Sequence, residues 1–320
     1  MRFIIRADAY SKSGAGHVMR SSVIAEELIN RGYEVFFVGN LDEIPWVREY
    51  IWNLGFKGIL TPGEHFVTNQ VSDTLILDSY EISIADPFIQ PSNWKKILVL
   101  VDDTTPSYIG HIYIHPGPAT SWTIPKTVSS GIFLVGLEYL LIRKSLRKLK
   151  NDYTSTSNQE MNILISSGGS DPYGFAKSLV AILSKSNSRF HAFVLAPDFA
   201  PPDDDTRFEI IPMGKEYERL LRSLDFVFTT AGTSSWEYHY LGLPVALASA
   251  IENQNRNYQY QIAQGMSWNL GYRDFDGSWH FDESLLKSVL SGTQQLISDV
   301  KISASELSEV GVDTILKLII

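Results

Sequence analysis

The sequence predicts an α/β protein with two successive parallel-sheet domains, on three observations. Short apolar runs that end in polar residues recur along the chain and alternate with helical or loop stretches, a pattern typical of parallel strands with functional residues at their carboxyl ends. A polar segment near the middle interrupts this pattern, which then starts again. The length of 320 residues exceeds the size at which single cores usually stop growing. Two such units indicate Rossmann-like domains that face one another across a cleft.

The first domain is expected to span residues 1–150. Its opening strand, 3–5, leads into a polar turn, and the following helix is expected to end at Gly32, a common residue just after a helix. The other elements expected in this domain are helices over 18–31 and 45–53 and strands over 33–38, 57–60, 74–78, 97–101 and 112–115.

A basic run from Arg143 to Lys150 and a Ser-, Thr- and Asn-rich stretch over 151–159 predict the domain boundary. We interpret them as a solvated helix end and a linker, with a membrane-touching patch as the alternative. The second domain is expected over 151–320. Its expected strands are 162–166, 189–195, 208–211, 226–229 and 243–247, and its expected helices are 173–184, 216–223, 236–241, 283–298 and 312–320.

Composition excludes several classes of protein. The net charge of −9 argues against a broad nucleic-acid surface and against adhesion to anionic lipid. The absence of cysteine excludes disulfides, thiolate metal sites and a cysteine nucleophile. Neither a secretory signal nor an apolar run of about 20 residues is visible. We therefore expect a cytoplasmic protein without stable membrane insertion.

The turn after the first strand carries an imidazole at an unusual place. Gly14 and Gly16 lie in this turn, and His17 follows them where the helix starts. A nucleotide-binding loop needs glycines for close backbone approach but does not need a histidine, so His17 predicts proton transfer. The alternative is a structural histidine that only caps the helix.

Two turns in the second half have the composition of phosphate-binding loops. In each, small residues lie between a buried strand and a helix, where free backbone N–H groups and the helix dipole would face an anion. The alternative is that these turns only connect strand to helix. The residues expected to bind the anion are Gly168, Gly169, Ser170, Gly232, Ser234 and Ser235.

Three further polar residues could bind the rest of a nucleotide sugar. Glu237 lies just inside the helix after the second turn and could accept hydrogen bonds from a ribose diol, or could simply answer the helix dipole. Asn253 and Gln254 could bind sugar hydroxyls, or could be surface amides. No histidine and carboxylate group has metal-ligand spacing, so we expect neither a metal nor another cofactor.

Motifs along nearly the whole chain occur in the order found in one family. They lie at residues 6–8, 14–17 with Arg20, 77–80, 101–103, 136–143, 167–172, 231–237 and 252–254. With these motifs the chain resembles the UDP-2,4-diacetamido-2,4,6-trideoxy-β-L-altropyranose hydrolases of pseudaminic acid biosynthesis and the related spore-coat polysaccharide proteins. The resemblance implies the GT-B architecture and metal-independent hydrolysis of a UDP-sugar to free sugar and UDP, with inversion at the anomeric carbon.

The resemblance also implies a role for each site residue. His17 would be the base that activates water, and Glu237 would hold the ribose. The two small-residue turns would hold the pyrophosphate, and the backbone near Met213 and Gly214 would hold uracil. The residues that would face the sugar or water are Asp8, Tyr80, Asn253 and Gln254.

Two departures from the family pattern concern the sugar. The family often has Asp where Glu252 stands, and tryptophans lie in 119–130 and 268–280 where the alignment is weak. The principal alternative is a GT-B glycosyltransferase that uses a UDP-sugar donor in surface polysaccharide biosynthesis. A third is a nucleotide-sugar-binding protein without catalysis.

Overall fold

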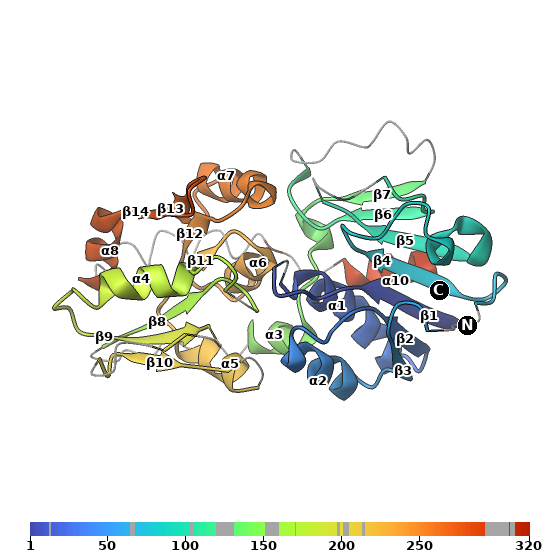
Figure 1. Ribbon diagram of the computed structural model, residues 1–320, viewed down its shortest axis with the longest axis horizontal. Helices are drawn as coiled ribbons and strands as arrows, with labels where there is room; N and C mark the ends of the chain where they lie inside the picture. Colours follow the sequence, from blue (N-terminus) through green and yellow to red (C-terminus); the bar gives the residue numbers. More distant parts are fainter. Residues whose placement is uncertain are drawn as a thin grey trace. The chain divides into compact units, whose positions relative to one another are not determined.

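The computed structural model describes residues 1–12, 14–64, 68–102, 105, 107–119, 131–150, 160–169, 171–196, 199–200, 205–212, 215–291, 307 and 311–320. The chain divides into two compact units, Met1–Ile142 with Glu309–Ile320, and Arg143–Ser308. Each unit contains a seven-stranded sheet with helices packed against it (Figure 1).

The first sheet has the order β3-β2-β1-β4-β5-β6-β7, and all its neighbouring strands are parallel. The chain first moves outward from β1 to β3 and then returns to the other side of β1, so β1 and β4 form the switch point of the sheet. Ligands of open α/β sheets bind outside the carboxyl ends of the strands at this point. The strands are β1 (Arg2–Ala7), β2 (Glu34–Val38), β3 (Gly58–Leu60), β4 (Thr74–Asp78), β5 (Lys96–Leu100), β6 (Ile112–His115) and β7 (Ile132–Val135).

Apolar cores cover both faces of the first sheet. Phe3 and Ile5 of β1 face one core, and Ile4 faces the other, as expected from the two-residue period of a strand. The helical elements of this unit are α1 (Gly16–Asn30), α2 (Pro45–Leu54), η1 (Pro87–Ile89), η2 (Pro91–Asn93), η4 (Leu137–Tyr139) and α10 (Val312–Ile319).

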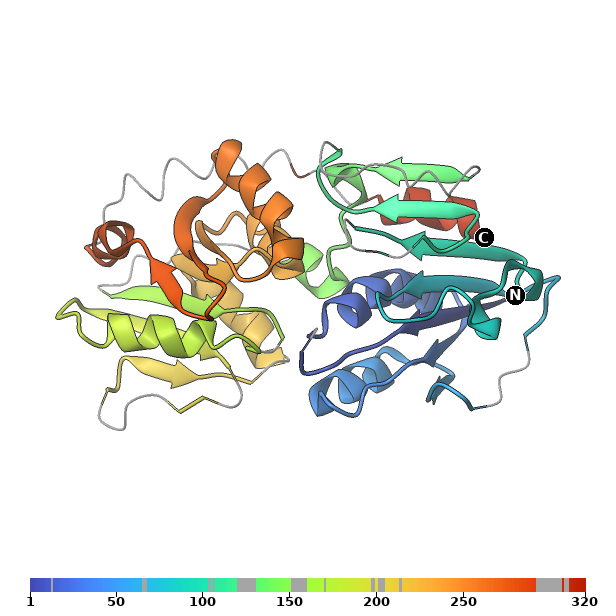
Figure 2. The ribbon, with the colours of Figure 1, turned by 45° about the horizontal axis from the view of Figure 1, so that its top comes forward.

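The helix α10 packs in the first unit, whereas the sequence analysis placed 312–320 in the second domain. Its apolar residues Val312, Ile315, Leu316 and Ile319 are buried in the same core as Phe3 of β1. In Figure 2 this red helix lies beside the first sheet, and it contacts α1. The strongly one-sided apolar pattern of α10 accounts for this burial.

The second sheet has the order β10-β9-β8-β11-β12-β13-β14. Its switch point is at β8 and β11, and only the edge strand β14 is antiparallel to its neighbour. The hairpin of β13 and β14 occupies the tryptophan-containing region 268–280 that the sequence left unassigned. The strands are β8 (Met161–Ser166), β9 (Phe190–Leu195), β10 (Phe208–Ile210), β11 (Phe226–Thr230), β12 (Val245–Ser249), β13 (Trp268–Arg273) and β14 (Trp279–Phe281).

Helix α7 of the second unit was not expected from the sequence. Gln261 is its one buried residue among those whose burial is described, so α7 lacks the apolar stripe that predicts a helix. Of the helix expected over 283–298, the structure shows α8, and residues 292–298 lie outside the described part. The helical elements are α3 (Lys144–Leu149), α4 (Phe175–Leu183), α5 (Lys215–Leu220), η6 (Leu221–Ser223), α6 (Thr233–Tyr240), η7 (Glu252–Gln254), α7 (Asn255–Ala263) and α8 (Glu283–Leu290). Across the part of the chain that the structure describes, no helix has the length and apolarity to cross a membrane.

Candidate active site

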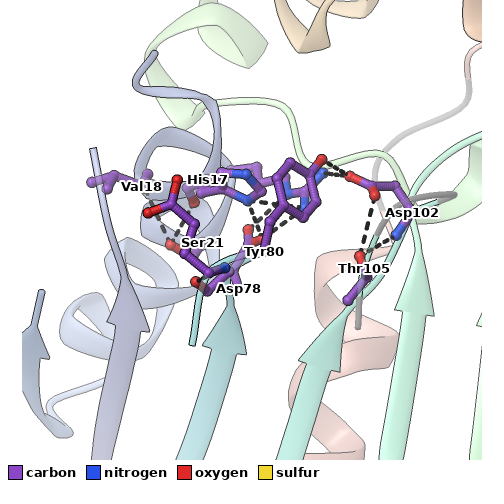
Figure 3. A network of polar contacts seen from close by, with 10 residues as sticks. His17, Val18, Ser21, Asp78, Tyr80, Asp102 and Thr105 are labelled. Carbon is purple, nitrogen blue, oxygen red and sulfur yellow. Dashed lines mark hydrogen bonds and ion pairs between the residues drawn. The ribbon is translucent and has the colours of Figure 1, made fainter. Parts of the chain in front are cut away.

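A buried histidine–aspartate pair lies at the switch point of the first sheet. His17 is the second residue of α1, and Asp78 is the last residue of β4. Because Ala7 of β1 pairs with Asp78 in the parallel ladder, the turn after β1 starts beside this carboxylate. The His17 Nδ1 atom lies 2.6 Å from Asp78 Oδ1 (Figure 3). His17 is 8% exposed and Asp78 is fully buried.

The pair defines which imidazole nitrogen can accept a proton. Burial alone would raise the pKa of Asp78. The charges and hydrogen bonds of Arg20 and His17 act in the opposite direction and outweigh the effect of burial, so the pKa of Asp78 lies below its ordinary value. The carboxylate is therefore ionised at neutral pH and accepts a hydrogen bond from Nδ1–H of His17. Nε2 of the neutral imidazole is then an acceptor, which is the state required of a general base.

Arg20 connects the two acidic residues of this site. It lies one turn after His17 on the same face of α1. Its Nε and Nη2 atoms each donate a hydrogen bond of 2.6 Å to Asp78. Its Nη1 lies 3.3 Å from Asp102 Oδ2. Burial acts to lower the pKa of Arg20, but the attraction of Asp78 and Asp102 raises it well above its usual value. The guanidinium is thus a fixed positive charge inside the site.

Tyr80 closes one side of the imidazole. Its ring meets the His17 ring edge-on, with centroids 4.1 Å apart and planes at 86°. The Tyr80 hydroxyl donates to Asp102, whose other carboxylate oxygen accepts from the Thr105 hydroxyl (Figure 3). We call His17, Arg20, Asp78, Tyr80 and Asp102 the His17 cluster. Its side chains come from α1 and from the carboxyl ends of two neighbouring strands, β4 and β5.

His17 and Tyr80 were predicted from the sequence as site residues, whereas Arg20, Asp78 and Asp102 stand in the family motifs but were given no role in the site. A signal for two of them existed, because the apolar strand 74–78 ends at Asp78 and the strand 97–101 is followed directly by Asp102. In the sheet order, 74–78 lies next to β1 and 97–101 lies next to 74–78, which places both carboxylates near the helix that carries His17 and Arg20.

The other first-unit residues expected in the site have structural partners. Asp8 is 5% exposed, pairs with Arg6 Nη1 at 2.8 Å and accepts from the backbone N–H of Asn40 at 2.8 Å. It therefore holds the loop after β2, and these partners are not members of the His17 cluster. Gly14 has φ +75°, which favours glycine, and Gly16 is the first residue of α1.

The two small-residue turns of the second unit lie side by side, because β8 and β11 are neighbours. Gly168 has φ +103°, and a methyl group added to it would lie 3.9 Å from Ser234 Oγ. A methyl group on Gly232 would lie 3.7 Å from Gln254 Nε2. Four of the expected substrate-binding residues therefore come together at the carboxyl edge of the second sheet.

At helix α4, which follows the first of these turns, a carboxylate of the protein itself binds the first N–H groups of the helix. Asp171 accepts hydrogen bonds of 2.9 Å from the backbone N–H groups of Phe175 and of Ala176. These are the donors that the sequence analysis expected to face a ligand. At α4 this expectation was wrong, because the carboxylate of Asp171 caps the helix.

The start of α6 differs, because no carboxylate lies in its first turn. Within the described ranges, no acceptor bonds the backbone N–H of Thr233 or of Ser234. The N-cap residue, Gly232, has no side chain to offer. The hydroxyl of Ser235 was expected to bind phosphate. It is fully buried and instead donates a hydrogen bond of 2.8 Å to Gly232 O. The free donors at this turn are thus the two backbone groups, with the partly exposed Ser234 beside them.

Glu237 is held by a cation rather than left open. Its two oxygens accept from Arg143 Nε at 2.7 Å and Nη2 at 2.8 Å. Arg143 is 6% exposed, so the interpretation of the basic run as solvated was wrong at this residue. A ribose diol would have to share the carboxylate of Glu237 with Arg143.

Part of the expected site lies outside the described residues. These are Ser170, Met213 and Gly214, together with the side chain of Asn253; the backbone of Asn253 is part of η7. Among residues that are described, no group of three or more His, Cys, Asp and Glu side chains could hold a metal ion. Gly169 lies in the described turn next to Gly168.

The fold is the GT-B type, an α/β architecture of two Rossmann-like domains. MurG from Acinetobacter baumannii has a TM-score of 0.60 at 13% identity, with 100% of this chain and 99% of MurG covered. The spinosyn forosaminyltransferase SpnP has a TM-score of 0.63 at 11% identity, with 100% and 99% covered. Arabidopsis thaliana UGT89C1, solved with UDP-L-rhamnose, has a TM-score of 0.56 at 12% identity, with 99% and 98% covered.

Two curated proteins are similar in sequence. The spore coat polysaccharide biosynthesis protein SpsG of Bacillus subtilis is 25% identical over 288 residues, which are 83% of each chain. The uncharacterized protein MJ1062 of Methanocaldococcus jannaschii is 26% identical over 282 residues, 81% of this chain. This chain spans 57% of the length of MJ1062. No protein-family model matches the chain.

Proposed function

We propose that this protein hydrolyses a UDP-sugar of the UDP-2,4-diacetamido-2,4,6-trideoxyhexose type to free sugar and UDP, with inversion, in the biosynthesis of nonulosonic (pseudaminic) acid. The observation that carries the proposal is the buried pair of His17 and Asp78. The carboxylate keeps the proton on Nδ1, so that Nε2 can take a proton from water.

In the proposed step, the oxygen of water bonds to the anomeric carbon as one of its protons passes to His17 Nε2. The bond from that carbon to the diphosphate oxygen breaks, and its electron pair leaves with UDP. The imidazolium formed is stabilised by Asp78, which is fully buried and ionised. Attack opposite the leaving group inverts the anomeric carbon.

The nucleotide is assigned to the second unit. The free N–H groups of Thr233 and Ser234 at the start of α6 would bind the diphosphate, with Gly168 and Gly169 allowing close approach. Glu237 would share its carboxylate between Arg143 and the ribose. Three assignments rest on the family resemblance: Ser170 to the diphosphate, Met213 to uracil, and Asn253 with Gln254 to the sugar.

The comparisons support a UDP-sugar rather than identify it. SpsG is named for polysaccharide biosynthesis, and UGT89C1 was solved with UDP-L-rhamnose. Asp8, bound to Arg6, and Tyr80 are proposed to border the sugar or the water. A cytoplasmic location remains a prediction.

Incubation of the protein with the UDP-diacetamido sugar and no acceptor tests the proposal. Mass spectrometry should detect UDP and free sugar, and NMR of the first-formed anomer should show inversion. His17→Ala should abolish release, whereas His191→Ala, which removes a histidine paired with Glu209 in the second unit, should not. Hydrolysis by His17→Ala at the wild-type rate would show that the assigned base is wrong.

The second candidate is a glycosyltransferase that uses the same donor class. The observation in its favour is the GT-B fold shared with glycosyltransferases such as SpnP. Here His17 would deprotonate a hydroxyl of an acceptor instead of water. Product analysis with and without candidate acceptors separates the two, because a transferase forms a conjugate and hydrolyses slowly. Binding of UDP without turnover of any UDP-sugar would favour a binding protein.

A further inference from the structure

A buried polar network lies directly behind the anion turn of the second unit, residues 231–235. Its central residue is Gln261 of α7, which is fully buried. The side-chain amide of Gln261 lies 3.0 Å from Ser235 Oγ, 2.9 Å from Asn257 Oδ1 and 2.6 Å from His239 Nε2. Two of these partners, Ser235 and His239, are on α6, and Asn257 is on α7 itself. A wholly buried amide with three partners is an unusual feature, and the catalytic step above does not use it.

The direction of each hydrogen bond follows from one backbone carbonyl. Asn257 Nδ2 lies 2.8 Å from Ala231 O, which can only accept. Asn257 therefore turns its Oδ1 towards Gln261, and Gln261 must offer its NH₂ group there. That same NH₂ group donates to Ser235 Oγ, so Ser235 directs its own proton to Gly232 O.

The other end of the network is uncharged. Burial lowers the pKa of His239 to about 4, although its hydrogen bond to Gln261 acts in the opposite direction. His239 is thus neutral at neutral pH. Its Nε2–H donates to Gln261 Oε1, and its Nδ1 has no hydrogen-bond partner within the described structure. An unsatisfied buried acceptor is costly, so the network is not explained by stability alone.

We propose that Gln261 is a positioning residue for the diphosphate of the nucleotide substrate, an inference that rests on the proposed function. Gly232 has no side chain to cap α6, so other contacts must define the shape of the turn. Asn257 and Gln261, one helical turn apart on α7, hold its two ends, at Ala231 O and at Ser235 Oγ. This leaves the N–H groups of Thr233 and Ser234 free and fixed for the anion.

The test compares Gln261→Met with Ser267→Ala. Methionine keeps the volume but cannot donate to Ser235. Ser267 lies 2.9 Å from His239 Nε2 in the same network, and among the described residues it has no hydrogen bond to the turn, so its variant is the matched control. UDP affinity is measured by calorimetry, kcat and KM are measured for the UDP-sugar, and urea unfolding is followed in parallel.

Gln261→Met should weaken UDP binding about tenfold, with KM affected more than kcat, while Ser267→Ala binds UDP like wild type. Ser235→Ala should give the same loss, and the double variant should add little to it, because both changes break one connection. If Gln261→Met does not fold, Ser235→Ala compared with Ser267→Ala decides alone.

Equal UDP affinity of Gln261→Met, Ser235→Ala and Ser267→Ala refutes the positioning role while leaving the hydrolase proposal intact. Selective weakening in a protein that turns over no UDP-sugar refutes the hydrolase proposal and supports the positioning role. A wild-type protein that does not bind UDP refutes both.

Discussion

Replacing Asp78 by asparagine tests the centre of the His17 cluster without changing its shape. The carboxylate accepts three hydrogen bonds of 2.6 Å each, one from His17 and two from Arg20. An amide has one acceptor oxygen, so its NH₂ group must face at least one of these donors. Arg20, which is 8% exposed, also loses its principal counter-charge. Breaking a buried ion pair in this way should lower the free energy of unfolding by about 3–5 kcal/mol.

The same substitution should damage catalysis by a separate route. When the new NH₂ group faces His17, it donates to Nδ1, and the imidazole proton must move to Nε2. Nε2 can then no longer accept a proton from water. Loss of a general base typically reduces turnover about 10²- to 10⁴-fold, and we expect a kcat reduction in this range for Asp78→Asn.

Asp73→Asn is the matched control for Asp78→Asn. Asp73 is a fully buried carboxylate directly before β4, and it pairs with Arg2 away from the His17 cluster. Both variants should lose stability in urea unfolding, but only Asp78→Asn should lose kcat for UDP release at a temperature where both are folded. Equal kcat values for the two variants would refute the proposed orientation of His17.

Three further predictions concern the second unit. The pKa of His239 is about 4 in the folded state and 6.5 in the unfolded state. Between these values the unfolded chain binds a proton at His239 that the folded chain does not, so the free energy of unfolding should fall by roughly 3 kcal/mol as pH drops from 6.5 to 4. His239→Gln should flatten this pH dependence in urea titrations. Glu237→Gln should lower the unfolding free energy by about 2–3 kcal/mol, since it breaks the buried pair with Arg143. The control is Glu218→Gln, because Glu218 Oε1 lies 3.5 Å from Arg143 Nη1; it should change the unfolding free energy by less than about 1 kcal/mol. Gly168→Ala should cost about 1–2 kcal/mol of backbone strain at φ +103° and weaken UDP binding in calorimetry, while Gly174→Ala at φ +65° should affect stability alone.

The pattern of the sequence predicted most of the parallel strands, because buried strands of this type are short continuous apolar runs with turn residues around them. It missed β7 and β13, which are also parallel to their neighbours. The pattern failed for α7, because the buried residue of this helix, among those whose burial is described, is Gln261 rather than an apolar side chain. It could not assign α10 to a unit, because an amphipathic helix shows that it has an apolar face but not which core covers that face.

The site was predictable only where chemistry is local. His17 is recognisable from its own turn, but its partner Asp78 is 61 residues away and becomes a neighbour through the β1–β4 ladder. The pair of Glu237 and Arg143 spans 94 residues, and nothing in either motif indicates the other. The cap at α4 was different: Asp171 stands four residues before Phe175, so its competition for the helix N–H groups could have been foreseen.

The position of α10 has a consequence for biosynthesis. Val312, Ile315, Leu316 and Ile319 complete the core that also contains Phe3, and each buried aliphatic side chain of this kind contributes about 1.5–3 kcal/mol. On the ribosome, the unit that carries His17 is therefore synthesised first but cannot complete its core until residue 319 has left the exit tunnel. The second unit, whose residues all precede α10, has no such requirement. Folding order and synthesis order are thereby separated, and the first unit must wait with part of its apolar surface uncovered.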